Sequence, residues 1–161
     1  MITLVSPPNG SIKRAGTVID FEVTDNDLAS FWVTVNDTST YYLGSPFNLS
    51  TVGWPDGLHF VNASAQDMAG SVTRADFLFT IDSTPPTVLI VSPTPGSLVR
   101  GGTVVDFDVS DAHLAGAEGS VDSAALTPLA APYDFSMAGL ADGVHTFEVR
   151  ASDVAGNSAQ L

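Results

Sequence analysis

Apolar and polar residues alternate with a period of two in short runs along this chain. In the run Ile19–Val23, apolar residues at 19, 21 and 23 alternate with Asp20 and Glu22, and the run Val61–Gln66 repeats the pattern. This period is typical of β-strands with one buried face, and Gly, Pro, Asn and Asp separate the runs. No segment has a helical stripe, so the pattern predicts an all-β fold. In the first half it predicts strands at residues 2–6, 17–24, 30–36, 40–43, 46–50, 58–66 and 72–81.

The chain contains an internal repeat. Asp56-Gly57-x-His59 recurs at the positions from 142 to 145, and Gly16–Val23 recurs as Gly102–Val109, both 86 positions later. A repeat that extends without gaps over the chain indicates two domains of one fold. The repeat predicts domain 1 at residues 1–83, a linker at 84–87 and domain 2 at 88–161. Pro85 and Pro86 make the linker short and stiff.

Seven short strands in domain 1 suit an immunoglobulin-like β-sandwich. Each repeat also has the ordered motifs Ser-Pro-x-x-Gly, Gly-Thr-Val-x-Asp-Phe-x-Val, Asp-Gly-x-His and Asp-x-Ala-Gly. Together these motifs resemble the bacterial and archaeal Ig-like repeat domains of secreted and cell-surface proteins. Domain 1 departs from the pattern at Ser71, where domain 2 has Asn157. The resemblance covers the whole chain and implies a fold and an extracellular setting rather than a chemistry.

Domain 2 is predicted to lack most of its last strand. Residues 72–81 of domain 1 correspond to 158–167, and the sequence stops at Leu161. One explanation is a truncated or processed fragment, for which Met1 directly before the strand Ile2–Val5 is a further sign. The other is that a second chain supplies the strand, because an unfilled sandwich exposes an apolar slot and unpaired backbone groups. The predicted donor is an extended segment such as Ile2–Val5 of a neighbour.

The charge of the chain excludes several functions. The net charge is -13, with 5 Lys and Arg against 18 Asp and Glu, so no basic patch can form to neutralise nucleic-acid phosphates or an anionic membrane. No apolar run approaches the ~20 residues of a membrane helix, so this segment is not expected to insert into a membrane. The chain has no Cys, which excludes disulfides and Cys-ligated metals.

His59 and His145 occupy equivalent positions, two residues before an inward-facing residue. An immunoglobulin fold has its corner tyrosine at this place, so we expect both histidines to bond to nearby backbone as structural corners. His113 is predicted to be a solvated loop residue. Neither a G-x-S-x-G nor an H-E-x-x-H signature is present, so the chain is not expected to be an enzyme.

Three aspartates form a candidate Ca²⁺ site. In tandem sandwiches Asp82, Asp111 and Asp153 are expected to converge near the junction of the domains, and Ca²⁺ prefers carboxylate and carbonyl oxygens. The alternative is that they form turns, because Asp bonds readily to its own backbone. Asp25, Asp27 and Asp67 form the equivalent set in domain 1. No cofactor is required in either case.

Three N-glycosylation sequons begin at Asn36, Asn48 and Asn62, all predicted to face outward. Domain 1 also has outward apolar residues that domain 2 lacks, which predicts a contact surface formed by Trp32, Phe60, Leu78 and Tyr42.

These features favour a non-enzymatic structural or interaction module of an extracellular surface or filament protein. Its job would be spacing, assembly or adhesion. Its predicted partners are copies of itself or neighbouring Ig-like domains, with strand donation as one route of assembly. The alternative is an accessory module of a secreted enzyme that binds glycans through aromatic residues, namely Trp32, Tyr41, Tyr42 and Trp54.

Overall fold

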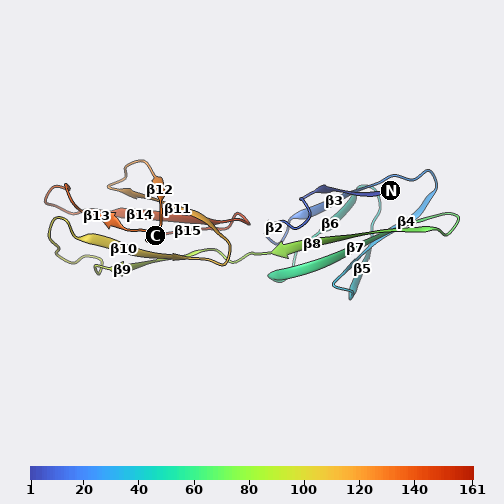
Figure 1. Ribbon diagram of the computed structural model, residues 1–161, viewed down its shortest axis with the longest axis horizontal. Helices are drawn as coiled ribbons and strands as arrows, with labels where there is room; N and C mark the ends of the chain where they lie inside the picture. The colour runs from blue at the N-terminus through green and yellow to red at the C-terminus, as the bar shows by residue number, and fades with distance from the viewer. The chain divides into compact units, whose positions relative to one another are not determined.

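The computed structural model describes residues 1–161, which form two compact units, Met1–Ser83 (unit 1) and Thr84–Leu161 (unit 2). Each unit consists of β-strands and loops (Figure 1). No helix in the structure is long and apolar enough to cross a membrane.

Unit 1 is a sandwich of two sheets. One sheet has the strand order β1-β3-β6 and the other has the order β2-β8-β7-β4-β5. Side chains from both sheets form one core, centred on Ile19, Phe21, Phe31, Val61 and Phe79, each at most 3% exposed. The strands are β1 Ile2–Ser6, β2 Ile12–Lys13, β3 Val18–Val23, β4 Leu28–Val35, β5 Ser39–Tyr42, β6 Phe47–Ser50, β7 Gly57–Asp67 and β8 Val72–Ile81.

The seven predicted strands of this unit are present, and alternation places the expected side chains in the core. Ile19 and Phe21 on β3, and Val61 and Ala63 on β7, are buried. Strand β2 was not predicted. It has two residues, too few to show a period, and it pairs parallel to β8, with Ile12 opposite Thr80.

Unit 2 repeats this arrangement with the sheets β13-β10-β9 and β12-β11-β14-β15. Its smaller core is centred on Val105, Phe107, Val109, Val149 and Ala151. The strands are β9 Thr87–Ser92, β10 Val104–Ser110, β11 Leu114–Val121, β12 Thr127–Leu129, β13 Phe135–Ser136, β14 Phe147–Asp153 and β15 Ser158–Gln160. Strand β9 begins at Thr87, inside the segment predicted as a linker.

The two units differ most at the last strand. In unit 1, β8 pairs with β7 along Gly57–Gln66. In unit 2, β15 pairs with β14 only along Arg150–Ser152, and Leu161 exchanges two backbone hydrogen bonds of 2.9 and 3.0 Å with Val149. The equivalent of the first part of β7, residues 143–146, is not a strand in unit 2.

The two cores also differ in how side-chain volume is divided between two facing positions. Unit 1 has Val33 and Leu49, whereas unit 2 has Gly119 and Phe135 at the equivalent places. A Cβ on Gly119 would lie 2.3 Å from Cζ of Phe135, so the ring fills the space that a side chain would need. The ring of Phe135 in turn packs on Phe107 and Phe147, with centroids 6.0 and 5.6 Å away.

We predict that Gly119→Ala destabilises unit 2 by roughly 1–3 kcal/mol, the usual cost of overpacking a core. Phe135→Leu added to Gly119→Ala should recover part of this loss, because it removes the clashing ring. Urea unfolding followed by far-UV circular dichroism measures both effects. Tryptophan fluorescence reports on unit 1 alone, because both Trp residues lie there, and should not change.

The matched control is Gly116→Ala on the same strand, where an added Cβ meets nothing within 4 Å. If Gly119→Ala proves no more destabilising than Gly116→Ala, this packing account is wrong.

Candidate functional site

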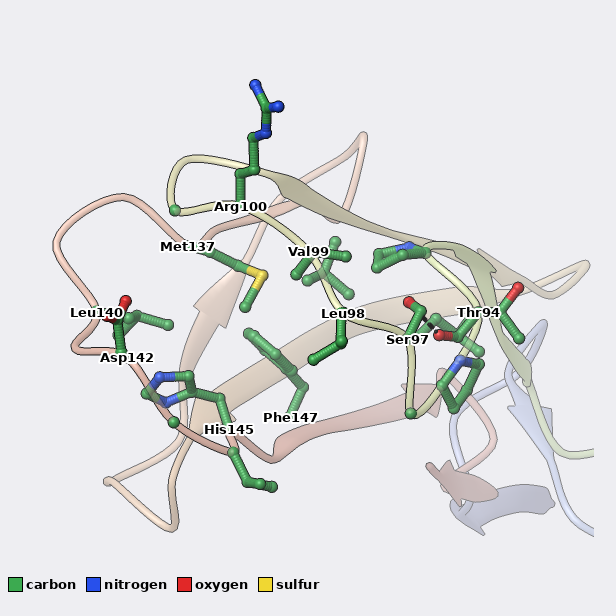
Figure 2. A pocket seen from close by; sticks show the side chains of 18 of the residues that line it. Thr94, Ser97, Leu98, Val99, Arg100, Met137, Leu140, Asp142, His145 and Phe147 are labelled. Atoms are coloured by element: carbon green, nitrogen blue, oxygen red, sulfur yellow. Dashed lines mark hydrogen bonds between the residues drawn. The ribbon is translucent and has the colours of Figure 1, made fainter.

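A groove of about 610 Å³ opens along one side of unit 2. One wall is the loop Ser97–Gly101 and the other is the segment Ala141–Phe147. Figure 2 shows Leu98 and Met137 directed toward Phe147 from different segments, with His145 beside them and Arg100 directed away. The floor is apolar and comes from the core residues Ile90, Val105 and Phe107.

In unit 1 the equivalent space is filled by the second half of β8. Phe77, Phe79 and Ile81 point into the core there, and the latter two are each 1% exposed. Strand β8 lies between β2 and β7.

The corresponding segments of unit 2, Leu98–Val99 and residues 143–146, form no strand. Leu98 is completely exposed and Val144 is 93% exposed. The groove therefore lies at the position that the second half of β8 occupies in unit 1.

The two predicted corner histidines lie beside the same type of turn in both units. A turn precedes β5 with positive φ at two successive residues, Asn36 and Asp37, closed by a 3.0 Å bond from the N–H of Thr38 to the carbonyl of Val35, as in a type I′ turn. In unit 2 the turn residues are Asp122 and Ser123. The first turn residue accepts a 2.9 Å bond from the backbone N–H of the residue that follows the histidine, Phe60 or Thr146.

The histidines differ in their turn partners. His59 donates from Nε2 to the carbonyl of Pro55 at 2.9 Å, and its Nδ1 accepts from the amide of Asn36 at 3.1 Å. Trp54 packs on this ring, with centroids 4.7 Å apart.

His145 faces an oxygen at both nitrogens, the carbonyl of Ala141 at 2.8 Å and Oδ2 of Asp122 at 2.7 Å, so both nitrogens must donate. The bond to Ala141, followed by that to Asp122, raises the pKa of His145 above its ordinary value. The bond from His145, followed by the backbone bond from Thr146, lowers the pKa of Asp122. The sequence indicated the corners but missed the Asn36 and Asp122 partners, which precede their histidines by the same spacing in both units.

The outward apolar residues of unit 1 lie on one sheet but do not form one patch. Trp32 is paired with Tyr42, and their rings lie 6.2 Å apart. Phe60 is paired with Leu78. The polar row formed by Thr34, Asn62 and Asp76 separates the two pairs. The single contact surface predicted from the sequence is therefore divided in two, because the strand register offsets Trp32 from Phe60 by two rows.

The four aromatic residues predicted to bind glycans lie in different surroundings. Tyr42 is 77% exposed beside Trp32 on the outer face. Tyr41 points to the opposite face of β5, because neighbouring residues of a strand alternate. Trp54 packs against the core of unit 1 and against His59.

The three sequon asparagines lie in different surroundings. The amide nitrogen of Asn36 bonds to His59, and that of Asn62 donates to Asp76 at 2.9 Å. Asn48 is exposed on the edge strand β6. Glycosylation stays a prediction, and Asn48 is the asparagine whose position suits it best.

Within unit 2, the carboxylates of two predicted calcium ligands, Asp111 and Asp153, accept hydrogen bonds. The buried carboxylate of Asp153 accepts two bonds from Asn157, 2.7 Å from its backbone N–H and 2.6 Å from its side-chain amide. Burial raises the pKa of Asp153, and these bonds outweigh burial, so the pKa lies below its ordinary value. Asp111 accepts a 2.6 Å bond from the N–H of His113, and the N–H of Asp82 donates to the carbonyl of Lys13 at 2.9 Å. Calcium binding stays a prediction.

The equivalent set in unit 1 shows the same turn-forming behaviour. Asp25 accepts a 3.1 Å bond from the N–H of Asp27, and Asp67 accepts a 2.8 Å bond from that of Ser71. The pKa of Asp27 is raised by its hydrogen bond to Asp25, then by desolvation and by the neighbouring charges of Asp25 and Asp67. The bond from Ser71 lowers the pKa of Asp67.

Comparison with solved structures identifies the fold. The fibronectin(III)-like modules of Clostridium thermocellum CbhA match 99% of this chain and 89% of their own, with a TM-score of 0.58 and 20% identity. Both units therefore have a β-sandwich fold similar to that of these modules. No protein-family model and no curated protein matches the sequence.

More distant similarity extends to two larger bacterial chains. The tandem repeat in the extending region of a large adhesion protein matches with a TM-score of 0.35 and 21% identity, over 46% of that chain. Latent PorU from Porphyromonas gingivalis matches with a TM-score of 0.45 and 12% identity, over 19% of that chain. The CbhA modules, with a TM-score above 0.5, confirm as a likeness of fold the resemblance to Ig-like repeat domains that was noted from the sequence motifs.

We predict that the stability of unit 2 depends on pH through His145 and Asp122. A raised His pKa stabilises the folded state fully below about pH 6.5, and this contribution is lost as pH rises through the folded pKa. A lowered Asp pKa stabilises above about pH 4 and is lost as pH falls through the folded pKa. The melting temperature of unit 2 should therefore fall between pH 6 and pH 9, as thermal circular dichroism would show.

Asp122→Asn should reduce the dependence of the melting temperature of unit 2 on pH, because it gives unit 2 the Asn–His pair that unit 1 has. The reciprocal variant Asn36→Asp should create a similar slope in the melting of unit 1, followed by tryptophan fluorescence. An unchanged slope in Asp122→Asn would refute the assignment of the pH dependence to this pair.

Proposed function

We propose that this chain is a non-enzymatic structural and interaction module of an extracellular protein, and that unit 2 takes part in assembly by accepting a β-strand from a neighbouring subunit. The observation that supports this function is the groove of unit 2, which lies where unit 1 places Phe77, Phe79 and Ile81. An apolar slot beside unpaired backbone groups is what strand addition requires. On this proposal the subunit contact fills the groove and completes the sandwich of unit 2.

The net charge of -13 favours the solubility of such a module. Similar modules occur in bacterial proteins, one of them described as an adhesion protein. Spacing, adhesion and filament formation all use stacked sandwiches, and strand donation would link one subunit to the next.

The donor segment predicted from the sequence, Ile2–Val5, is part of a strand of unit 1. Residues Ile2–Ser6 form β1, which pairs with β3, and Ile2 and Leu4 pack against the core of unit 1. Donation of this segment would therefore require its release from unit 1. Because β1 is an edge strand of a three-stranded sheet, such a release is one route to assembly.

A second candidate function is glycan binding by the pair Trp32 and Tyr42. Their tilted rings, 6.2 Å apart, leave Tyr42 largely exposed on the outer face of a sheet, which suits stacking against a sugar. This function would use unit 1 and leave the groove unused.

Strand donation predicts that the purified chain associates with itself. Light scattering coupled to size exclusion, from micromolar to millimolar protein, should show a mass that rises above that of one chain. Leu98→Lys in the groove should weaken the association, whereas Leu89→Lys, an exposed leucine of β9 outside the groove, should not. A folded monomer at every concentration would exclude assembly between copies.

Glycan binding predicts a different outcome. Tyr42→Ala should abolish retention of the chain on an insoluble polysaccharide without changing its melting temperature, because Tyr42 is mostly exposed. Binding that survives this substitution would remove the aromatic pair from consideration.

A further inference from the structure

We propose that strand β5 of unit 1 is a pairing edge, at which a second copy of this chain adds its own β5 in antiparallel orientation. The contact joins the five-stranded sheets of two copies into one continuous sheet. It is symmetric, with Tyr41 of one copy opposite Tyr41 of the other. This inference concerns unit 1 alone and does not depend on the groove of unit 2.

The backbone of β5 is open on one side. Strand β5 is the outermost strand of its sheet, and all of its residues are exposed (Figure 1). The N–H of Leu43 donates to the carbonyl of Phe31 at 3.0 Å, in line with the pairing of β5 and β4. Because hydrogen-bonding direction alternates along an antiparallel strand, Tyr41 also bonds to β4, whereas the N–H and carbonyl groups of Thr40 and Tyr42 face away from it. Such a row of open groups is a template for another strand.

Unit 2 protects the equivalent edge, and unit 1 does not. Pro128 of β12 occupies the position of Tyr42, 86 residues later. A proline has no N–H to offer to a further strand, so proline on an edge strand discourages pairing between sheets. Strand β12 is also shorter, with three residues against four in β5. Since the two units have the same fold, the architecture does not require the open edge of unit 1.

The distribution of charge allows a second copy to approach this edge, although the net charge of the chain is -13. Residues 38–46 contain no charged side chain, and Asp37 in the turn before β5 is the nearest acid along the sequence. When Tyr41 lies opposite its own copy, Asp37 of each copy comes opposite Ser45 of the other. The two Asp37 carboxylates are then at opposite ends of the paired strands, so like charges do not face each other across the contact.

The open backbone groups set the register. With Thr40 of one copy opposite Tyr42 of the other, both residues of both copies exchange their N–H and carbonyl bonds. A shift that keeps this alternation moves one of these residues beyond the partner's β5, which spans Ser39–Tyr42. The register also pairs a β-branched with an aromatic side chain on the outer face, and it brings the two Tyr41 rings together on the other face. The contact is therefore self-complementary, as a two-fold symmetric interface must be.

The length of β5 limits the strength of this contact. A contact along a strand of four residues is smaller than the interfaces of about 1,200–2,000 Å² that stable complexes bury. We therefore expect weak pairing that appears at high protein concentration. Pairing becomes stronger where several copies of the chain are held together, because linked contacts form at a high effective concentration.

Sedimentation equilibrium of the intact chain and of Tyr42→Pro tests this inference. The substitution gives unit 1 the residue that unit 2 has at this position, and the N–H that it removes faces away from β4. The melting temperature should therefore change little. Pairing should weaken at least about tenfold, because each copy loses an intermolecular hydrogen bond. The matched control Tyr42→Val keeps the N–H and a strand-forming side chain, so its pairing should stay within about threefold of the unsubstituted chain.

Hydrogen exchange at two protein concentrations locates the contact. The amides of Thr40 and Tyr42 should exchange more slowly at millimolar than at micromolar protein. Those of Tyr41 and Leu43 already bond to β4, so their exchange should not depend on concentration.

A chain that stays monomeric, or one that pairs equally well with Tyr42→Pro, would overturn the inference. So would a loss of pairing in Tyr42→Val as complete as in Tyr42→Pro, because the tyrosine ring rather than the open edge would then form the contact. Association that survives Leu98→Lys but not Tyr42→Pro supports the β5 edge and excludes the groove as the contact between copies. Association with the reverse pattern, and with protection outside β5, assigns the contact to the groove and overturns the edge.

Discussion

The packing of a β-sandwich requires that each strand position beside the core be filled. In unit 1 the second half of β8 meets this requirement, because it buries Phe79 and Ile81 and provides hydrogen-bond partners for β7 and β2. In unit 2 the same position is a groove. The two segments beside it, Leu98–Val99 and residues 143–146, form no strand. The exposure of Leu98 and Val144 and the late start of β14 at Phe147 follow from this one difference.

Because the two units have the same fold and similar sequences, equivalent positions in them can be compared directly. The corner histidines have the same surrounding backbone, yet Asn36 bonds to one ring and the carboxylate of Asp122 bonds to the other, where it helps to raise the pKa of His145. Gly119 and Phe135 fill the volume that Val33 and Leu49 fill in unit 1. The fold thus tolerates different core and corner chemistry as long as volume and hydrogen bonding are conserved locally.

The sequence predicted the fold well because alternation and turn residues act locally. Ile19, Phe21 and Val61 are buried as their period indicates. Features that depend on register or on distant partners could not be read in this way. The strand pairing that separates Trp32 from Phe60, the two-residue strand β2 and the Asp122 partner of His145 are set by tertiary contacts. The sequence predicted an apolar slot beside a short last strand, but it did not predict which residues form the walls of the groove.

The most direct test of strand acceptance by unit 2 is an experimental structure of the chain in its associated form. The account predicts continuous density for an extended segment that runs antiparallel beside residues 143–148, with three alternate side chains on the floor formed by Val105 and Phe107. A groove closed by its own residues, with Leu98 packed on Phe147 and no added strand, would contradict it.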